Sequence, residues 1–196
     1  MSRRVSLERK TRETHVQVAL DLDGRGDFEG GTGLGFLDHM LAAFARHGQL
    51  DLTVRCQGDL HVDEHHSVED VALTLGSAMA AATGDRAGLA RFGHSYVPMD
   101  EALVRAVLDL SGRPWLEWKV PRLRERVGDL PVELAEHFWR SFAQQGALTL
   151  HVECLYGANQ HHILEAVWKA AGRAVAQAVG PSEGGGVLST KGSLRE

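Results

Sequence analysis

The strongest chemical signal in the sequence is a His-His-x-x-Glu motif that occurs twice. Its two copies consist of the following residues: His65, His66 and Glu69, then His161, His162 and Glu165. On a helix the glutamate lies near both histidines of its motif, so either His/Glu pair can chelate one metal ion. The two adjacent histidines point about 100° apart on a helix, so they cannot easily bind the same ion. One natural arrangement gives the second histidine and the glutamate to one ion and the first histidine to another.

The two motifs belong to an internal duplication of the chain. His39, Gly48 and Cys56 each have a counterpart 98 residues later, which is half of the 196-residue length. After a loop the match resumes at the motifs, now 96 residues apart, as a two-residue deletion would produce. The counterpart of His39 is His137, so the repeat supplies six histidines and two glutamates. Divided between two ions, that is three histidines and one glutamate each, which suits Mn, Fe, Zn, Co or Ni.

The composition indicates an ordinary globular protein and excludes several other classes. Hydrophobic residues make up 43% of the chain, enough for a real core. The formal net charge of -5 argues against a general nucleic-acid or membrane-surface binder, although a local basic pocket is compatible with it. Two cysteines are too few for a disulfide framework, and neither a secretory signal nor an apolar run of about 18 residues is visible. We therefore expect a cytoplasmic protein.

The hydrophobic periodicity places the candidate ligands on helices between strands. Helical spacing is present at residues 36–47, 65–82, 133–145 and 161–179. Strand-like alternation is present at residues 14–22, 49–56, 102–110, 115–119 and 147–155. The polar faces of these strands indicate antiparallel or mixed sheets that are covered on one side. The expected fold is an α/β protein of the two-layer α+β type, with two similar half-domains, each a mixed sheet with helices packed on one face.

The duplication also predicts how the chain is divided. We expect a first half-repeat at residues 1–90 and a second half-repeat at residues 91–180, with residues 86–98 connecting them. A Gly-rich C-terminal segment follows at residues 181–196. The last segment lacks periodicity and is expected to be a loop. In it, three glycines precede Ser189, Thr190 and Lys191, a composition that favours phosphate binding although the Walker pattern is absent.

Several motifs together resemble the imidazoleglycerol-phosphate dehydratases of histidine biosynthesis. Besides the two His-His-x-x-Glu motifs, the matching segments are residues 11–14, 22–24, 36–41, 91–93, 111–114 and 188–192. The resemblance covers roughly residues 5–194 and implies half-domains that resemble domain 2 of ribosomal protein S5. It also implies a homo-oligomer in which trimers assemble into a shell of twenty-four subunits. Its cofactor would be Mn²⁺, two ions per subunit, at sites shared between subunits.

The resemblance further assigns the metal ligands to two sites. One site would consist of His39, His66, Glu69 and His161. The other would consist of His65, His137, His162 and Glu165. Each motif helix then serves two different ions, as expected for sites at a subunit interface.

The implied reaction is loss of water from imidazole glycerol phosphate to give imidazole acetol phosphate. The proton to be removed lies on a carbon without an adjacent carbonyl, so the imidazole ring must supply the electrons. A metal ion on a ring nitrogen favours a metal-bound imidazolate, which can expel the hydroxyl group to give a diazafulvene. A base then deprotonates this intermediate to an enol. The resemblance implies Glu13 and Glu165 as catalytic residues, and a positioned carboxylate contributes about 10²–10⁴-fold to such a step.

The resemblance also implies which residues bind the small phosphorylated imidazole substrate. They are Glu13, His47, Arg91, Arg113, Lys169, Ser189, Thr190 and Lys191. Arginine is suited to bidentate contact with a phosphate group. Ala42 and Ala43 stand where relatives often carry polar residues, which points to a missing substrate contact.

Two other functions use the same ligands. A dinuclear metallohydrolase would activate water between ions about 3.5–4 Å apart. A metal-storing shell would hold the ions without catalysis. Glu13→Gln separates the last alternative from the dehydratase, because a storage shell keeps its metal and loses nothing else, whereas a dehydratase loses turnover.

Overall fold

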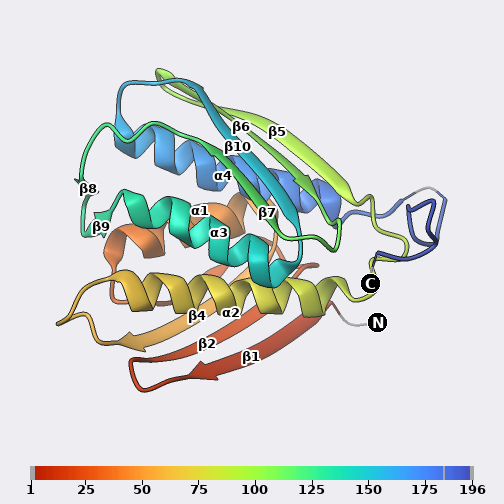
Figure 1. Ribbon diagram of the computed structural model, residues 1–196, viewed down its shortest axis with the longest axis horizontal. Coiled ribbons are helices and arrows are strands. Elements are labelled where there is room, and N and C mark those ends of the chain that lie inside the picture. The colour runs from red at the N-terminus through yellow and green to blue at the C-terminus, as the bar shows by residue number, and fades with distance from the viewer. Residues whose placement is uncertain (1–2, 183, 195–196) are drawn as a thin grey trace.

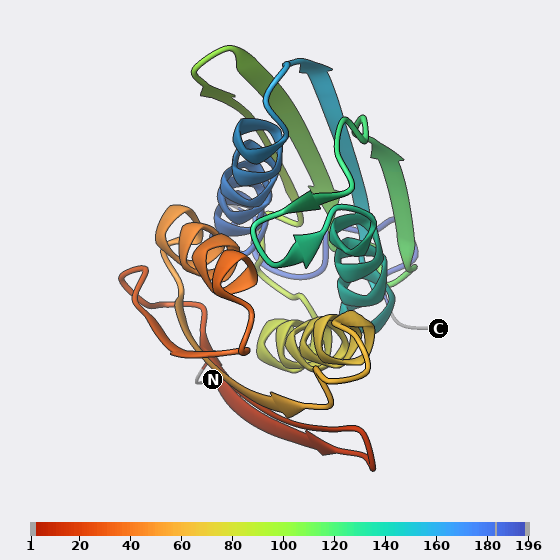
Figure 2. The same cartoon turned by 90° about the vertical axis from the view of Figure 1, so that its left-hand side faces the viewer.

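The computed structural model describes residues 3–182 and 184–194. Parts of the expected first half-repeat (residues 1 and 2) and of the Gly-rich segment (residues 183, 195 and 196) lie outside the described residues. The chain forms two four-stranded sheets, and the helices lie between them (Figures 1 and 2). Among the described residues, no helix is long and apolar enough to cross a membrane.

The first sheet has the strand order β1-β2-β4-β3. Its strands are β1 (Arg4–Lys10), β2 (Thr14–Asp21), β3 (Phe28–Gly31) and β4 (Asp51–Gly58). β3 runs parallel to β4, whereas the other neighbours are antiparallel. Val16, Val18 and Leu20 alternate along β2 and are buried, because every second side chain of a strand faces the helices.

The second sheet repeats this arrangement with the order β5-β6-β10-β7. Its strands are β5 (Phe92–Met99), β6 (Ala102–Asp109), β7 (Trp115–Lys119) and β10 (Thr149–Tyr156). Again one pair, β7 with β10, is parallel, and the other pairs are antiparallel. Two mixed sheets of matching topology confirm the expected fold class, and the second half also contains a short hairpin of β8 (Arg126–Val127) and β9 (Leu130–Pro131).

The helices of the two halves face each other between the sheets. They are α1 (Gly35–Gly48), α2 (His65–Thr83), α3 (Glu133–Gly146) and α4 (Gln160–Ala178). α1 packs on α4, and α2 packs on α3, so both contacts join one half to the other. A Cβ atom at Gly172 would lie 2.5 Å from the carbonyl oxygen of Phe44, and one at Gly76 would lie 2.6 Å from that of Phe142. These glycines therefore let each motif helix approach the backbone of its partner.

An aromatic cluster fills the space where the halves meet. The rings of Phe44 on α1 and Trp139 on α3 are 5.7 Å apart, and those of Trp139 and Trp168 are 5.2 Å apart. All three side chains are almost fully buried. Burial of this size holds the helices rigidly, which matters because the candidate ligands project from them.

The predicted helices are present with ends shifted by at most one residue, but several strands were not predicted. β1 carries mostly charged and exposed residues, and β3 contains two glycines, so neither has strand-like alternation of apolar residues. Residues 86–98 were expected to connect the halves, whereas Phe92–Met99 forms the edge strand β5. Gly93 and Pro98 weakened the strand pattern there, since both residues are rare inside central strands.

Candidate metal centres and phosphate pocket

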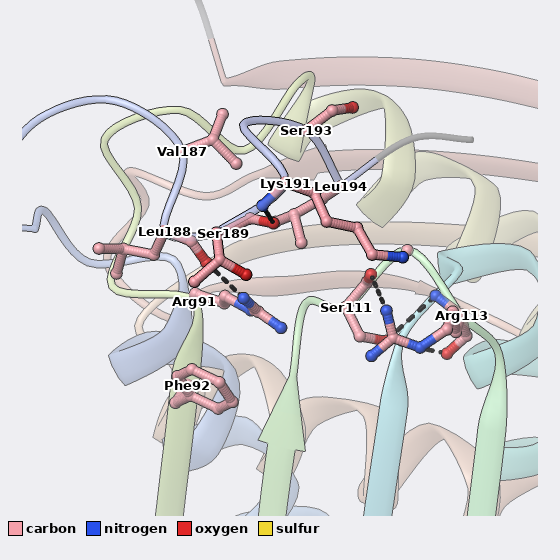
Figure 3. A pocket seen from close by; sticks show the side chains of 12 residues that line it. Arg91, Phe92, Ser111, Arg113, Val187, Leu188, Ser189, Lys191, Ser193 and Leu194 are labelled. Atoms are coloured by element: carbon pink, nitrogen blue, oxygen red, sulfur yellow. Dashed lines mark hydrogen bonds between the residues drawn. The ribbon is translucent and has the colours of Figure 1, made fainter.

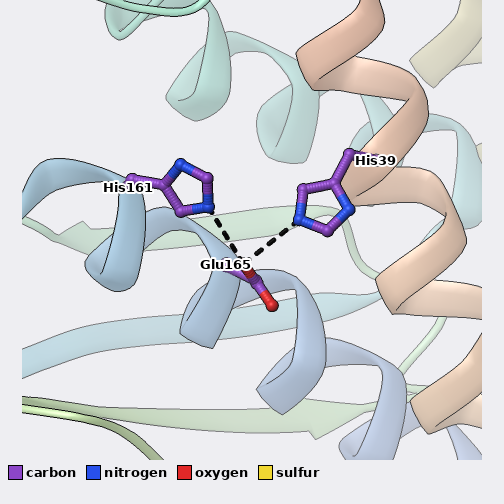
Figure 4. Close-up of side chains that lie close together, drawn as sticks. All are labelled: His39, His161 and Glu165. Atoms are coloured by element: carbon purple, nitrogen blue, oxygen red, sulfur yellow. Dashed lines mark hydrogen bonds and ion pairs between the residues drawn. The ribbon is translucent and has the colours of Figure 1, made fainter.

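Three candidate metal ligands meet where α1 passes the start of α4, a group that we call the α1–α4 triad (Figure 4). Nε2 of His39 and Nε2 of His161 lie 3.2 and 3.1 Å from Oε2 of Glu165. The ligand atoms of the three residues all lie within 4.8 Å of one another, close enough to hold a single ion. Burial raises the pKa of Glu165, but hydrogen bonds from Lys169, His39 and His161 outweigh it and lower this pKa to about 2. The carboxylate is therefore ionised, as a metal ligand must be.

A second group, the α2–α3 triad, consists of His65, Glu69 and His137. The rings of His65 and His137 are 4.5 Å apart, and Nε2 of His137 lies 3.4 Å from Oε1 of Glu69. Nε2 of His137 is also buried without a hydrogen bond among the described residues. A buried imidazole nitrogen that lies beside a carboxylate without a hydrogen bond to it fits a metal site, where both atoms would bind one ion.

The two triads are equivalent under the internal repeat. Each contains one histidine from the second turn of a short helix, together with the first histidine and the glutamate of a motif. In each case the short helix and the motif helix come from different halves of the chain. The duplication therefore produces two sites of the same composition, each at the contact between the halves.

The structure differs from the expected division of ligands, because the two glutamates are exchanged. The resemblance placed Glu69 with His39 and His161, whereas within one chain Glu165 lies beside these histidines. Glu69 instead lies with His65 and His137. Helical geometry allows the glutamate to pair with either histidine of its motif. The opposing helix decides between them, because it places His39 or His137 beside the first histidine and the glutamate. The second histidine, which was expected to pair with the glutamate, points elsewhere.

The second histidine of each motif is held by an acidic side chain outside both triads. Oδ2 of Asp59 lies 3.1 Å from Nδ1 of His66. Oε2 of Glu101 lies 2.6 Å from Nδ1 of His162. Each hydrogen bond raises the pKa of its imidazole. The sequence did not predict these acidic partners, because Asp59 lies in a loop and Glu101 in the turn between β5 and β6, without a recognisable motif.

Five of the expected substrate-binding residues line one pocket of about 970 Å³ (Figure 3). They are Arg91, Arg113, Ser189, Thr190 and Lys191. Oδ1 of Asp109 lies 2.7 Å from Nε of Arg91, in an ion pair. The carbonyl oxygen of Ser111 accepts a hydrogen bond of 3.3 Å from Nη1 of Arg113. These five residues place three cationic side chains and two hydroxyl groups around the cavity, a composition that suits a phosphate group. The segment 187–194 forms one wall and has no helix or strand, as expected for a loop.

The other three expected substrate-binding residues lie away from this pocket. Glu13 is exposed in the turn between β1 and β2, with Oε2 3.9 Å from Nε2 of His66. Nζ of Lys169 lies 2.7 Å from Oε1 of Glu165, directly beside the α1–α4 triad. His47 is half-buried near the end of α1, where burial, and then the charge of Lys169, lowers its pKa. Within one chain, these residues do not form a single substrate site.

The pocket around Arg91 and Arg113 and the two triads lie at opposite ends of the helices. Arg91 of the pocket donates its backbone N–H to Ala178, the last residue of α4. Glu165 lies near the start of the same helix. At 1.5 Å per residue, that separates the two positions by roughly 20 Å along the helix axis. Figure 1 shows the same arrangement, with the starts of the helices at the left and the C-terminal segment at the right.

Comparison with known proteins finds one family. The model of the imidazoleglycerol-phosphate dehydratase family matches residues 32–175. The imidazoleglycerol-phosphate dehydratase of Heliobacterium modesticaldum is 55% identical to this chain, and the match covers 98% of this chain and 100% of that protein. The imidazoleglycerol-phosphate dehydratase of Ralstonia pickettii is 54% identical, and the match covers 99% of this chain and 100% of that protein.

Solved structures give the same result. The crystal structure of imidazoleglycerol-phosphate dehydratase from Staphylococcus aureus has a TM-score of 0.83 at 34% identity, and covers 91% of this chain and 99% of its own. The crystal structure of IGPD from Pyrococcus furiosus in complex with (S)-C348 has a TM-score of 0.82 at 34% identity, and the match covers 95% of this chain and 99% of that chain. Sequence and fold thus agree over nearly the whole chain, which therefore belongs to the imidazoleglycerol-phosphate dehydratase family.

Proposed function

We propose that this chain is a metal-dependent hydro-lyase that converts imidazole glycerol phosphate into imidazole acetol phosphate. Because the chain belongs to this family, its reaction is the dehydration of imidazoleglycerol phosphate in histidine biosynthesis. The observation that carries the metal dependence is the pair of equivalent His/Glu triads. Among the described residues the two triads have no ligand in common, which favours two separate single-ion sites over the paired ions of a dinuclear hydrolase.

The donor sets of the triads fit a divalent transition-metal ion. Imidazole nitrogens with a carboxylate oxygen suit Mn²⁺ and its neighbours in the first row. The buried, unbonded Nε2 of His137 supports this fit. By resemblance we infer Mn²⁺, two ions per subunit. When bound, these ions would supply Lewis acidity toward the imidazole ring of the substrate.

The fourth ligand of each ion is proposed to come from a neighbouring subunit. His39, His161 and Glu165 would be joined by His66 of a neighbouring subunit. His65, His137 and Glu69 would be joined by His162 of a neighbouring subunit. In support, a carboxylate on Nδ1 of each second histidine favours the tautomer whose Nε2 can bind metal. This division keeps three histidines and one glutamate for each ion.

The distance between the phosphate pocket and the triads also supports shared active sites. A substrate with one ring and a phosphorylated three-carbon chain is far shorter than the roughly 20 Å of α4 that separates them. A substrate that contacts both must therefore take its phosphate pocket and its metal ions from different subunits. We propose the assembly implied by the resemblance, a cytoplasmic shell of twenty-four subunits built from trimers.

The proposed roles of the remaining residues follow from their positions. The pocket around Arg91 and Arg113 binds the phosphate group, with Ser189, Thr190 and Lys191 as further donors. Glu13, with Glu165, is proposed to move protons, because it is exposed and free to reach a substrate held by a neighbouring subunit. Lys169 and His47 are proposed to contact the substrate beside the α1–α4 triad. The half-repeats 1–90 and 91–180, followed by segment 181–196, remain the proposed division of the chain.

Turnover and metal content of Glu13→Gln test the proposed function together. We expect this variant to keep its metal and to lose turnover by about 10²–10⁴-fold, because it loses a group that transfers protons. Glu29→Gln, at an exposed glutamate of β3, is the matched control and should keep both properties. A Glu13→Gln variant with full turnover contradicts the assigned role, and a metal-loaded wild type without turnover contradicts the proposed function.

A further inference from the structure

The β8–β9 hairpin extends from the second half of the chain to the helix starts of the first half. Figure 1 shows it at the left of the molecule, where the helices begin. Its turn is Gly128–Asp129, and Gly128 has φ 58°, which suits the first central position of a type II′ turn. Leu130 is buried, so the hairpin is anchored in the core rather than free in solvent.

The tip of the hairpin caps helix α1. Oδ2 of Asp129 accepts a hydrogen bond of 2.5 Å from the backbone N–H of Gly35, and Oδ1 accepts one of 3.0 Å from Phe36. Leu34, at the N-cap position of α1, provides no side-chain cap of its own. A carboxylate at this place satisfies two free N–H groups and complements the positive end of the helix dipole. His39, a ligand of the α1–α4 triad, lies one turn further along.

The same turn also supports the aromatic wall of the α1–α4 triad. A Cβ atom at Gly128 would lie only 3.2 Å from Cβ of Phe36, so the turn packs directly on this side chain. The ring of Phe36 lies 5.1 Å from that of His161 and 6.4 Å from that of His39, edge to face in both cases. The hairpin therefore contacts the residue that lies against both imidazoles of the triad.

A third contact connects the hairpin to the α2–α3 triad. Nη2 of Arg126 lies 2.5 Å from Oε1 of Glu64 and also donates to the carbonyl oxygen of Asp129. Glu64 is the N-cap residue of α2 and directly precedes His65. One hairpin thus holds the starts of both first-half helices that carry metal ligands.

We propose that Asp129 is a positioning residue for metal binding, and that the hairpin sets the geometry of both triads through α1 and α2. This inference rests on the proposed function, because it presumes that the triads hold metal. Loss of the cap would let the first turn of α1 fray and move His39 relative to Glu165. The α1–α4 triad should suffer more than the α2–α3 triad, which the hairpin reaches only through Arg126.

Mn²⁺ binding by the full-length chain, measured from the electron paramagnetic resonance of free Mn²⁺, tests this proposal. We expect Asp129→Ala to weaken binding by about tenfold or more, the lower end of what loss of an orienting partner costs. Asp129→Asn keeps one acceptor oxygen and should lie between this variant and the wild type. Asp51→Ala is the matched control, because Asp51 caps three loop N–H groups, at Arg25, Gly26 and Asp27. Asp51→Ala should lower the midpoint temperature of thermal unfolding and leave Mn²⁺ binding unchanged.

The possible outcomes separate the inference from the proposed function. If the wild-type chain binds Mn²⁺ and Asp129→Ala binds it equally well, the proposed role of the hairpin is overturned, and the proposed function is not affected. If Asp129→Ala does not fold, Asp129→Asn decides, and unchanged binding by that variant overturns the role. Equal losses in Asp129→Ala and Asp51→Ala would show a general stability effect and also overturn it. A wild-type chain that binds no Mn²⁺ overturns the proposed function and this inference with it.

Discussion

At the scale of single residues, each motif glutamate lies beside two histidines that come from different halves of the chain. Glu165 is mostly buried and receives hydrogen bonds from His39, His161 and Lys169. Although burial raises the pKa of this carboxyl group, these hydrogen bonds lower it to about 2, so the carboxylate is ionised near neutral pH.

The first prediction concerns the stoichiometry of metal binding. Glu165→Gln and Glu69→Gln should each reduce the metal content from two ions per chain to one, because glutamine cannot supply the negative charge that each site needs. Elemental analysis after removal of free metal measures this change. Glu136→Gln is the control, because Glu136 lies next to His137 on α3 but pairs with Arg140 instead of a ligand. Loss of both ions from either variant would show that the sites are not independent.

The second prediction concerns the acidic partner of His162. Glu101→Ala should weaken binding of one metal ion by about 10–100-fold, as is typical when a carboxylate that orients a histidine ligand is removed. A metal titration with a competing chelator measures the change. Glu8→Ala removes a similar carboxylate, 2.6 Å from His15, a histidine outside both triads, and should leave metal binding unchanged. Equal effects in both variants would argue against His162 as a ligand.

The sequence did not predict which candidate ligands lie together within one chain. Spacing alone leaves two pairings open, because residues three and four positions apart are both neighbours on a helix. The choice depends on where the opposing helix places its own histidine, which is a tertiary contact. Asp59 and Glu101 were not predictable for a similar reason. They reach their histidines from a loop and from a turn, and no periodic pattern marks such positions.

At the scale of elements, close helix crossings hold the two sides of each triad at a fixed distance. α4 passes α1 at Gly172, and α2 passes α3 at Gly76, both with too little room for a Cβ atom. The two glycines are equivalent under the repeat, so the same contact occurs in both half-to-half interfaces. Any residue larger than glycine must move a backbone, because the nearest atoms are carbonyl oxygens rather than flexible side chains.

The third prediction tests this crossing. Gly172→Ala should destabilise the fold by about 1–3 kcal/mol, the usual cost of overpacking a close contact. It should also weaken metal binding at the α1–α4 triad more than at the α2–α3 triad. Thermal unfolding and metal titration measure the two effects. Gly184→Ala is the control, since a Cβ atom there meets nothing within 4 Å. A fully stable Gly172→Ala variant would contradict the role of this glycine.

Periodicity predicted the helices because long amphipathic segments carry many matching positions. It predicted the half-buried strands β2, β4, β6, β7 and β10 for the same reason. β1, β3 and β5 are edge strands, and their polar or glycine-containing sequences lack that pattern. The hairpin of β8 and β9 has two residues per strand, which is too short for any period to be visible.

At the scale of the whole molecule, one chain contains all parts of the proposed site but not in one place. The pocket around Arg91 and Arg113 lies at one end of the helices, and the triads lie at the other. The sequence could predict both sets of residues, but it carries no information on which subunits bring them together. In the proposed assembly, that arrangement depends on surfaces that meet only between subunits.

The fourth prediction follows from this separation. Arg113→Ala and Glu165→Gln should each lose turnover, whereas mixed assemblies of the two variants should regain about a quarter of it, the share of sites that combine two intact contributions. Co-expression with two affinity tags and a turnover assay on the mixed fraction measure this recovery. A mixture of Arg113→Ala and Arg91→Ala is the control, because both changes affect the same pocket, and should regain nothing. A lack of recovery in the first mixture would place the whole site within one chain.

The most direct test of the central claim is turnover of imidazole glycerol phosphate by metal-stripped protein during titration with Mn²⁺. The account predicts almost no product without metal, and formation of imidazole acetol phosphate that saturates at two ions per chain. Full turnover by the stripped protein would contradict it. So would the absence of product from protein that demonstrably holds two ions per chain.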